Sequence, residues 1–240
     1  MRTINAQGME SRELNRAIRA SDDGCILTNC CGQRFLGAGM SDKTVTIEGI
    51  PGNALGAYLN GGEINVHGNA QDAVGDTMNA GRIVIHGSVG DAAGYAMRGG
   101  EIFVEGDAGY RAGIHMKQYQ DKIPVMVIGG CAGSFLGEYQ AGGVILVLGR
   151  NPRDRRIVHN FPGTGMHGGK LILRGNCEDL VFPKQVSVRK ATEGDMALIT
   201  KYVREYCRLF GGDIRELLDV PFTVVTPDSS NPYKQMYVAN

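Results

Sequence analysis

The sequence predicts an all-β fold. We expect a parallel β-helix, a single-stranded solenoid of about seven 19-residue turns, with short helical caps at both ends. Glycine makes up 36 of the 240 residues, about twice its usual share. Many of these glycines recur at a fixed interval of 19 residues, and alternating apolar and polar residues precede one glycine of each repeat. Such alternation is typical of a β-strand.

The glycines fall into three columns that share one register, and glycine suits corners because it tolerates positive φ and close backbone approach. The step from Gly106 to Gly130 is 24 residues and the step from Gly149 to Gly175 is 26, so the repeat contains two insertions. A degenerate first turn begins at Cys30. The columns hold Gly49, Gly68, Gly87 and Gly106; Gly56, Gly75, Gly94 and Gly113; and Gly62, Gly81 and Gly100.

One short strand per 19 residues cannot bury both of its faces in a hairpin array. Stacked coils solve this problem, because each strand pairs in parallel with the next and alternate residues fill the axis. Ile64 and Val66, followed one repeat later by Ile83 and Ile85, are expected to point inward. A second inward column is rich in methionine, and comprises Met40, Leu59, Met78, Met97, Met116 and Met166, interrupted by Gln140.

The flanks differ from the repeat. A short amphipathic helix is predicted over residues 9–20, with Leu14 and Ile18 on one side. Thr192, with Asp195 three residues later, indicates the start of a second helix. Its apolar face would comprise Met196, Ile199, Val203, Tyr206 and Phe210. We therefore divide the chain into an N-terminal helical cap (1–24), a glycine-repeat β-helix (25–176) and a C-terminal helical cap with an extended, loop-rich tail (177–240).

One outward strand column changes character along the solenoid. It is polar at Thr46 and Asn65 and then becomes Val84, Phe103, Val127, Leu146 and Ile172. Something must cover an apolar stripe of this length. The favoured interpretation is the chain's own C-terminal helix. The alternative is a partner subunit, which would make Phe103, Val127 and Leu146 interface residues.

The composition of the chain argues against several classes of partner and indicates its cellular compartment. The chain has 25 basic and 25 acidic residues, and the lack of a basic excess argues against nucleic acid and anionic membranes as partners. No apolar run is long enough to span a bilayer, and the N-terminus lacks the apolar core of a signal peptide. Six cysteines without a CxxC pair suggest a cytoplasmic protein with reduced, mostly buried thiols.

His67 and His86 occupy equivalent outward positions on adjacent turns, flanked by Glu48 and Glu105 on the next rungs. Stacked imidazoles could share a metal ion. A flat ladder offers poor tetrahedral geometry, however, so we favour a solvated or interface ladder.

Cys25, Cys30 and Cys31 could be ligands of a cluster, but buried thiols are the favoured interpretation. The glycine-rich strings lack the strand–turn–helix setting of a nucleotide site. We therefore predict no catalytic, cofactor-binding or metal-binding residue in this chain.

The two insertions carry charged and aromatic side chains, and insertions in repeat proteins often make contacts. They could be solvated loops, or they could dock to an acidic surface of a partner. The candidate interface residues are Lys117, Tyr119 and Lys122 in the first insertion and Arg153, Arg155 and Arg156 in the second.

Three segments carry a resemblance to a known family: NCCGQRFLGAGM, GNALGAYLNGGEINVHGNAQDAVGDTMNAGRIVIHG and GEYQAGGVILVLG. They resemble the glycine-repeat domain that closes the large subunit of glutamate synthase, over roughly residues 25–176. The β-helix subunit of formylmethanofuran dehydrogenase is similar to the same repeat. The resemblance implies a right-handed parallel β-helix, a handedness that matches the general bias of parallel crossover connections.

In glutamate synthase an amidotransferase releases ammonia from glutamine, and a domain with FMN and an iron–sulfur cluster joins the ammonia to 2-oxoglutarate. The β-helix domain buttresses both and has no catalytic residue. This chain resembles only that domain. The resemblance therefore implies a non-catalytic assembly subunit of a glutamate synthase-like oxidoreductase complex for ammonia assimilation and glutamate biosynthesis. Its expected partners are amidotransferase and flavin/iron–sulfur synthase subunits, which would hold the FMN and the cluster.

Two alternatives remain open. One is the β-helix subunit of formylmethanofuran dehydrogenase or of another multisubunit redox complex. The other is a left-handed hexapeptide-type acyltransferase. Coils of that type have about 18 residues and an aliphatic residue opening each side, whereas this chain repeats every 19 residues and fixes glycine.

Overall fold

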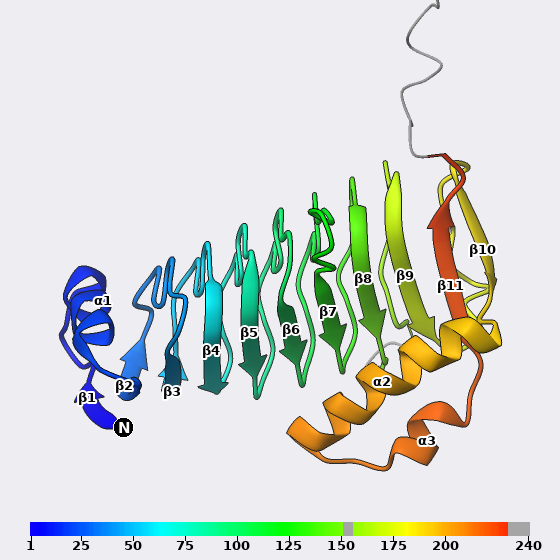
Figure 1. Cartoon of the computed structure of the whole chain (residues 1–240). Helices are drawn as coiled ribbons and strands as arrows, with labels where there is room; N and C mark the ends of the chain where they lie inside the picture. Colours follow the sequence, from blue (N-terminus) through cyan, green and yellow to red (C-terminus); the bar gives the residue numbers. More distant parts are fainter. Residues whose placement is uncertain (151–155, 230–240) are drawn as a thin grey trace, which may run out of the picture.

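The computed structural model of the chain describes residues 1–150 and 156–229. In these residues, eleven strands form one continuous sheet in the order β1-β2-β3-β4-β5-β6-β7-β8-β9-β11-β10, wound into a parallel β-helix as predicted (Figure 1). The strands are β1 (Arg2–Asn5), β2 (Gly24–Cys31), β3 (Thr44–Ile50), β4 (Asn60–His67), β5 (Ala80–Ile85), β6 (Glu101–Val104), β7 (Val125–Ile128), β8 (Ala141–Val147), β9 (Gly168–Arg174), β10 (Val186–Lys190) and β11 (Phe222–Pro227). The helices are α1 (Ser11–Ala20), α2 (Glu193–Phe210) and α3 (Ile214–Leu218).

Strand pairing follows the register of the repeat. Ile64 of β4 lies beside Ile83 of β5, and Ile83 lies beside Ile102 of β6. The insertion before β7 leaves the register intact, because Ile102 pairs with Met126. These residues are buried along the axis. The one polar member of the methionine column, Gln140, is also buried, and its Nε2 donates to the carbonyl oxygens of Gly142 (3.1 Å) and Gly143 (3.2 Å).

A six-residue segment of each turn has positive φ at its first, third and fifth positions. In the turn after β4 these are Ala73 (57°), Gly75 (68°) and Thr77 (52°). The third position lies against the core, since a Cβ on Gly75 would stand 2.5 Å from Cδ1 of Ile102. Glycine is needed at the third position because φ is positive there and because a Cβ would clash with the core. The first and fifth positions also have positive φ but have room for a side chain.

Polar side chains at the corners join successive turns from Asn69 onward. Oδ1 of Asp72 accepts a hydrogen bond from the backbone N–H of Asp91 (2.9 Å), and Oδ1 of Asp91 accepts one from Tyr110 (2.8 Å). These bonds satisfy backbone donors where the strand pairing is interrupted.

The N-terminal end is closed by α1, as expected, with Leu14 and Ile18 in the core. Asn15 of α1 ties the helix to the first coil, because its Oδ1 accepts from the N–H of Gly37 at 3.0 Å. The structure also adds β1, which pairs in parallel with β2 and places Ile4 beside Leu27. This extra strand was not expected from the sequence.

The C-terminal end is closed by the chain's own tail. Strand β11 pairs antiparallel with β9, and β10 pairs antiparallel with β11. The open edge of the last coil is therefore covered, although β10 remains as a new and largely exposed edge.

Helix α2 begins with the predicted capping box. The N–H of Asp195 donates to Oγ1 of Thr192 at 3.4 Å, and Oδ2 of Asp195 accepts from the N–H of Thr192 at 3.0 Å. The same buried carboxylate pairs with Lys170 of β9 (2.8 Å) and Arg189 of β10 (2.6 Å). The hydrogen bond from Arg189 and, to a smaller extent, the one from Lys170 hold the pKa of Asp195 well below its usual range.

The apolar stripe lies beneath α2, which runs along the outer face of the sheet (Figure 1). Phe103, Val127 and Leu146 are buried there in one cluster with Val203 and Tyr206 of the helix. The favoured interpretation, that the chain covers its own stripe, is confirmed. The alternative fails for these three residues, because α2 occupies the surface that a partner would need.

Candidate interaction surface

The outward side of the six-residue segments carries two rows of rings over the later turns of the solenoid. We call this surface the aromatic face, and define it as Tyr110, Arg111, Phe135 and Phe161 in one row and Tyr95, His115 and Tyr139 in the other. The members of a row occupy equivalent or neighbouring positions of successive repeats.

The second row is stacked along the solenoid axis. The rings of His115 and Tyr139 are 5.1 Å apart with an interplanar angle of 11°, and Tyr95 meets His115 edge to face at 5.9 Å. In the next turn, Gly165 makes room for Tyr139, because a Cβ there would lie 2.4 Å from the ring atom Cδ1.

The first row is organised around a cation. The guanidinium of Arg111 lies 4.8 Å from the ring centre of Tyr110 and 5.7 Å from that of Phe135. Its Nε is 2.8 Å from Oε2 of Glu138, whose side chain is only 7% exposed. A buried carboxylate thus fixes the arginine between the rings.

These rings remain accessible to solvent. Tyr95 is 40% exposed, Tyr110 37% and Phe161 57%. Within residues 1–150 and 156–229, the other exposed Phe and Tyr side chains are Phe35, Tyr58 and Tyr119. The first two belong to six-residue segments of earlier turns, and Tyr119 lies in the insertion beside the aromatic face. Clustered exposed aromatic residues mark interaction sites more often than isolated ones do.

The first insertion forms a small hairpin. The N–H of Tyr119 donates to the carbonyl oxygen of Lys122 (3.3 Å) and the N–H of Lys122 donates to that of Tyr119 (3.1 Å). Lys117, Tyr119 and Lys122 are all exposed. Because Lys117 follows His115 by two residues, the hairpin begins at the border of the aromatic face.

The second insertion is only partly described. Arg153 and Arg155 lie outside the described residues, while Arg156 is exposed where the description resumes. The roles of all three as interface residues stay predictions.

The histidine pair is a packing element of α2. The rings of His67 and His86 are stacked at 4.7 Å with an interplanar angle of 12°, and Phe210 meets His86 edge to face at 5.0 Å. Burial and the neighbouring His67 lower the pKa of His86, whereas Glu105 opposes the shift. Among the described residues no group of three or more metal-ligating side chains comes together.

The six cysteines lie in settings that differ in burial. Cys25, Cys30 and Cys177 are buried, whereas Cys131 and Cys207 are half-buried and Cys31 is exposed. Burial raises the pKa of Cys30 to about 11, so this thiol is a poor nucleophile at neutral pH.

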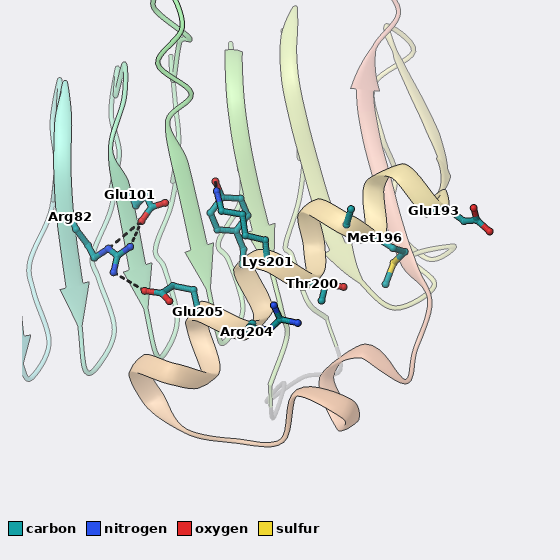
Figure 2. Close-up of a pocket in the computed structure, with 10 residues that line it drawn as sticks. Arg82, Glu101, Glu193, Met196, Thr200, Lys201, Arg204 and Glu205 are labelled. Carbon is teal, nitrogen blue, oxygen red and sulfur yellow. Dashed lines mark hydrogen bonds and ion pairs between the residues drawn. The ribbon is translucent and has the colours of Figure 1, made fainter.

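A groove of about 650 Å³ runs beside α2 (Figure 2). At its sheet end Arg82 pairs with Glu101 of β6 and with Glu205 of α2, each at 2.6 Å. Arg208, together with Arg82, holds the pKa of Glu205 below its usual range. These ion pairs neutralise the charged groups and join α2 to the sheet.

The sequence could have revealed the aromatic face. Phe35, Phe135 and Phe161 occupy the first position of the six-residue segment, and the repeats between Phe35 and Phe135 have alanine or arginine there. The signal is weak because outward positions vary from turn to turn, whereas the glycine and inward columns repeat regularly.

In the part of the chain that the structure describes, no helix combines the length and apolar character needed to cross a bilayer. The chain is 43% identical over 248 residues to the uncharacterized protein MJ1350 of Methanocaldococcus jannaschii, an alignment that covers 98% of this chain and 95% of that protein. A similar fold occurs in the formyltransferase/hydrolase complex FhcABCD from Methylorubrum extorquens, solved with methylofuran, with a TM-score of 0.53 and 21% identity over 95% of this chain and 91% of that one. The family model of the GXGXG motif, which describes the C-terminal domain of glutamate synthase, matches residues 4–226. The chain therefore belongs to the GXGXG family.

Proposed function

We propose that this chain is a non-catalytic β-helix subunit that holds together the enzyme subunits of a multisubunit oxidoreductase complex. The aromatic face is the observation that carries the proposal, because the solenoid axis is packed with apolar side chains while a cluster of rings stays exposed on its surface. A molecule of this kind is suited to binding other proteins at its surface.

The proposed complex is of the glutamate synthase kind and serves ammonia assimilation and glutamate biosynthesis in the cytoplasm. Its partners would be an amidotransferase subunit and a flavin/iron–sulfur synthase subunit, which would hold FMN and the cluster. Membership of the GXGXG family over residues 4–226 supports this choice. The hexapeptide acyltransferase alternative is not retained, because the strands pair at the 19-residue register of this family.

A formyl-transferring complex is the second candidate. The likeness of this fold to a chain of the FhcABCD complex favours it, at a TM-score of 0.53. In that case the chain would hold together subunits that handle a formyl group, in place of subunits that handle ammonia.

Native purification separates the two candidates. The chain is tagged at its N-terminus in its own host, and the purified material is assayed for flavin, iron, glutamine-dependent glutamate formation and formyl transfer. We expect co-purifying subunits with flavin, iron and glutamate formation. Formyl transfer without flavin would establish the second candidate, and a chain that elutes alone at 25.7 kDa would refute both.

Deleting the chain tests its non-catalytic role. We expect the remaining subunits to separate on gel filtration while each keeps its partial reaction, such as glutamine hydrolysis by the amidotransferase. Loss of a partial reaction from subunits that stay together would place chemistry in this chain.

A further inference from the structure

We propose that the aromatic face and the 117–122 hairpin beside it dock an acidic surface of a partner enzyme subunit. This inference rests on the proposed function and assigns it a surface and a partner chemistry. Two features support it, the covering of the ring faces and the distribution of the cations, and other occupants fit the surface less well.

Neighbouring groups cover a face of several rings. His115 and Tyr139 stack on one another at 5.1 Å, and the backbone of Gly165 lies against Tyr139. The guanidinium of Arg111 covers Tyr110 at 4.8 Å. Binding a base or a sugar requires a free ring face on which the ligand stacks. Ring edges carry partial positive charge and favour oxygen atoms, which a protein surface supplies as carboxylates and carbonyl groups.

Unpaired cations border the rings. Arg98, Lys117 and Lys122 are exposed, and in the described part of the chain none of them forms an ion pair. Arg98 and Lys117 occupy equivalent positions on adjacent turns, and Cβ of Lys122 packs near Gly99, 3.1 Å from where a Cβ on that glycine would lie. Arg82 and Arg111, by contrast, are both neutralised by carboxylates. The hairpin carries Lys117 and Lys122 and one exposed carboxylate, Asp121. Because cations are in excess there, charge complementarity favours a partner surface with Asp or Glu at this site.

Other occupants fit less well. A two-fold dimer through this face would bring the same cations of both copies together. Nucleic acid is disfavoured because the chain has 25 basic and 25 acidic residues, without a continuous basic stripe. An acidic protein surface satisfies both the ring edges and the lysines.

Zero-length cross-linking maps the surface directly. The natively purified complex is treated with a carbodiimide, which joins lysine amines to carboxylates that touch them, and the linked peptides are identified by mass spectrometry. We expect Lys117 and Lys122 to link to Asp or Glu of another subunit. Links from this chain only through Lys184 or Lys190, or links only to a second copy, would overturn the inference while leaving the proposed function intact.

Matched variants test the energetics. Lys117→Glu combined with Lys122→Glu reverses two exposed charges on the hairpin, and Lys184→Glu combined with Lys190→Glu reverses two exposed charges at the far end of the solenoid. We expect the first pair to weaken co-elution with the partner at least about tenfold and to reduce the loss of co-elution on adding salt, because the attractive charge pairs that salt screens are no longer present. The second pair should leave co-elution unchanged. Equal effects of the two pairs would contradict the assignment.

A third variant probes the rings without disturbing the fold. Phe161 has φ of 61° and is 57% exposed. Asparagine tolerates this backbone region better than most residues, so Phe161→Asn removes the ring at little conformational cost. We expect weaker co-elution with an unchanged thermal midpoint. If the wild-type chain alone forms a dimer that Phe161→Asn dissociates, the occupant is a second copy and the proposal is wrong. A wild-type chain that never co-purifies with other subunits refutes the proposed function itself.

Discussion

Left-handed backbone occurs at three positions of every six-residue segment, yet glycine is fixed at only one of them. Ala73 and Gly75 both have positive φ, at 57° and 68°. The difference between them is space, since a Cβ on Gly75 would meet Cδ1 of Ile102 at 2.5 Å. At Ala73 the methyl group fits and only the strain of the backbone remains.

Gly75→Ala therefore should lower the free energy of unfolding by about 2 kcal/mol or more, from left-handed strain and from overpacking of Ile102. Ala73→Gly, in the same turn, should leave the free energy of unfolding within about 0.5 kcal/mol of the wild type, because relieved strain offsets added chain entropy. Urea unfolding of both variants measures this contrast. Equal destabilisation by the two changes would contradict it.

His86 makes the last turn of α2 sensitive to pH. The pKa of His86 is lowered in the folded chain, so the unfolded segment binds protons more readily below about pH 6.5. The contact with Phe210 should therefore weaken as pH falls through this range, despite the favourable Glu105. Hydrogen exchange of residues 205–212, corrected for intrinsic rates, should show lost protection at pH 5 relative to pH 8.

His86→Phe supplies the control for this prediction, because a phenyl ring keeps the contact with Phe210 and does not titrate. We expect protection of residues 205–212 to become independent of pH in this variant. An unchanged loss of protection at pH 5 would show that another group is responsible.

Helix α2 is fastened near both of its ends. At the first turn Asp195 joins β9 and β10 through Lys170 and Arg189. Towards the last turn the hydroxyl of Tyr206 donates to the carbonyl oxygen of Glu105 at 2.9 Å, and Arg150 donates to the same hydroxyl at 3.2 Å. Gly129 provides the space, because a Cβ there would lie 1.9 Å from the Tyr206 hydroxyl oxygen.

Asp195→Ala should lower the free energy of unfolding by about 2 kcal/mol, since it removes the carboxylate half of the capping box, and with it the acceptor that two cations share. The depressed pKa of Asp195 means that its stabilisation is fully present above about pH 4 and is lost as pH falls below that value. The difference in urea midpoint between wild type and variant should therefore be large at pH 7 and shrink below pH 4. A difference that stays constant with pH would exclude this role.

The elements that the sequence predicted are those with local or periodic causes. The capping box at Thr192 and Asp195 involves neighbouring residues, and the stacked strands follow the 19-residue register. The four-residue strand Arg2–Asn5 is too short to show a period, and the antiparallel pairing of Phe222–Pro227 with β9 is set by the end of the solenoid. Tertiary context, which no single window of sequence contains, determined both.

The surfaces of the molecule differ in how far they are covered by the chain itself. The outer face of the sheet is closed over its later strands by α2, and the two ends are closed by α1 and by β11 (Figure 1). The six-residue segments keep aromatic rings exposed or half-buried, and they lie near Arg98 and Lys117, which with Lys122 form no ion pair in the described part of the chain. With equal numbers of acidic and basic residues overall, attraction to a partner would arise from this local pattern and not from net charge.

The native mass of the particle that contains this chain tests the central claim most directly. Sedimentation of the tagged chain, purified gently from its own host, should give a heteromeric species far above 25.7 kDa. The Lys117→Glu and Lys122→Glu double variant should shift the chain toward its monomer mass. A wild-type chain that sediments alone at 25.7 kDa, at its cellular concentration, would contradict the account.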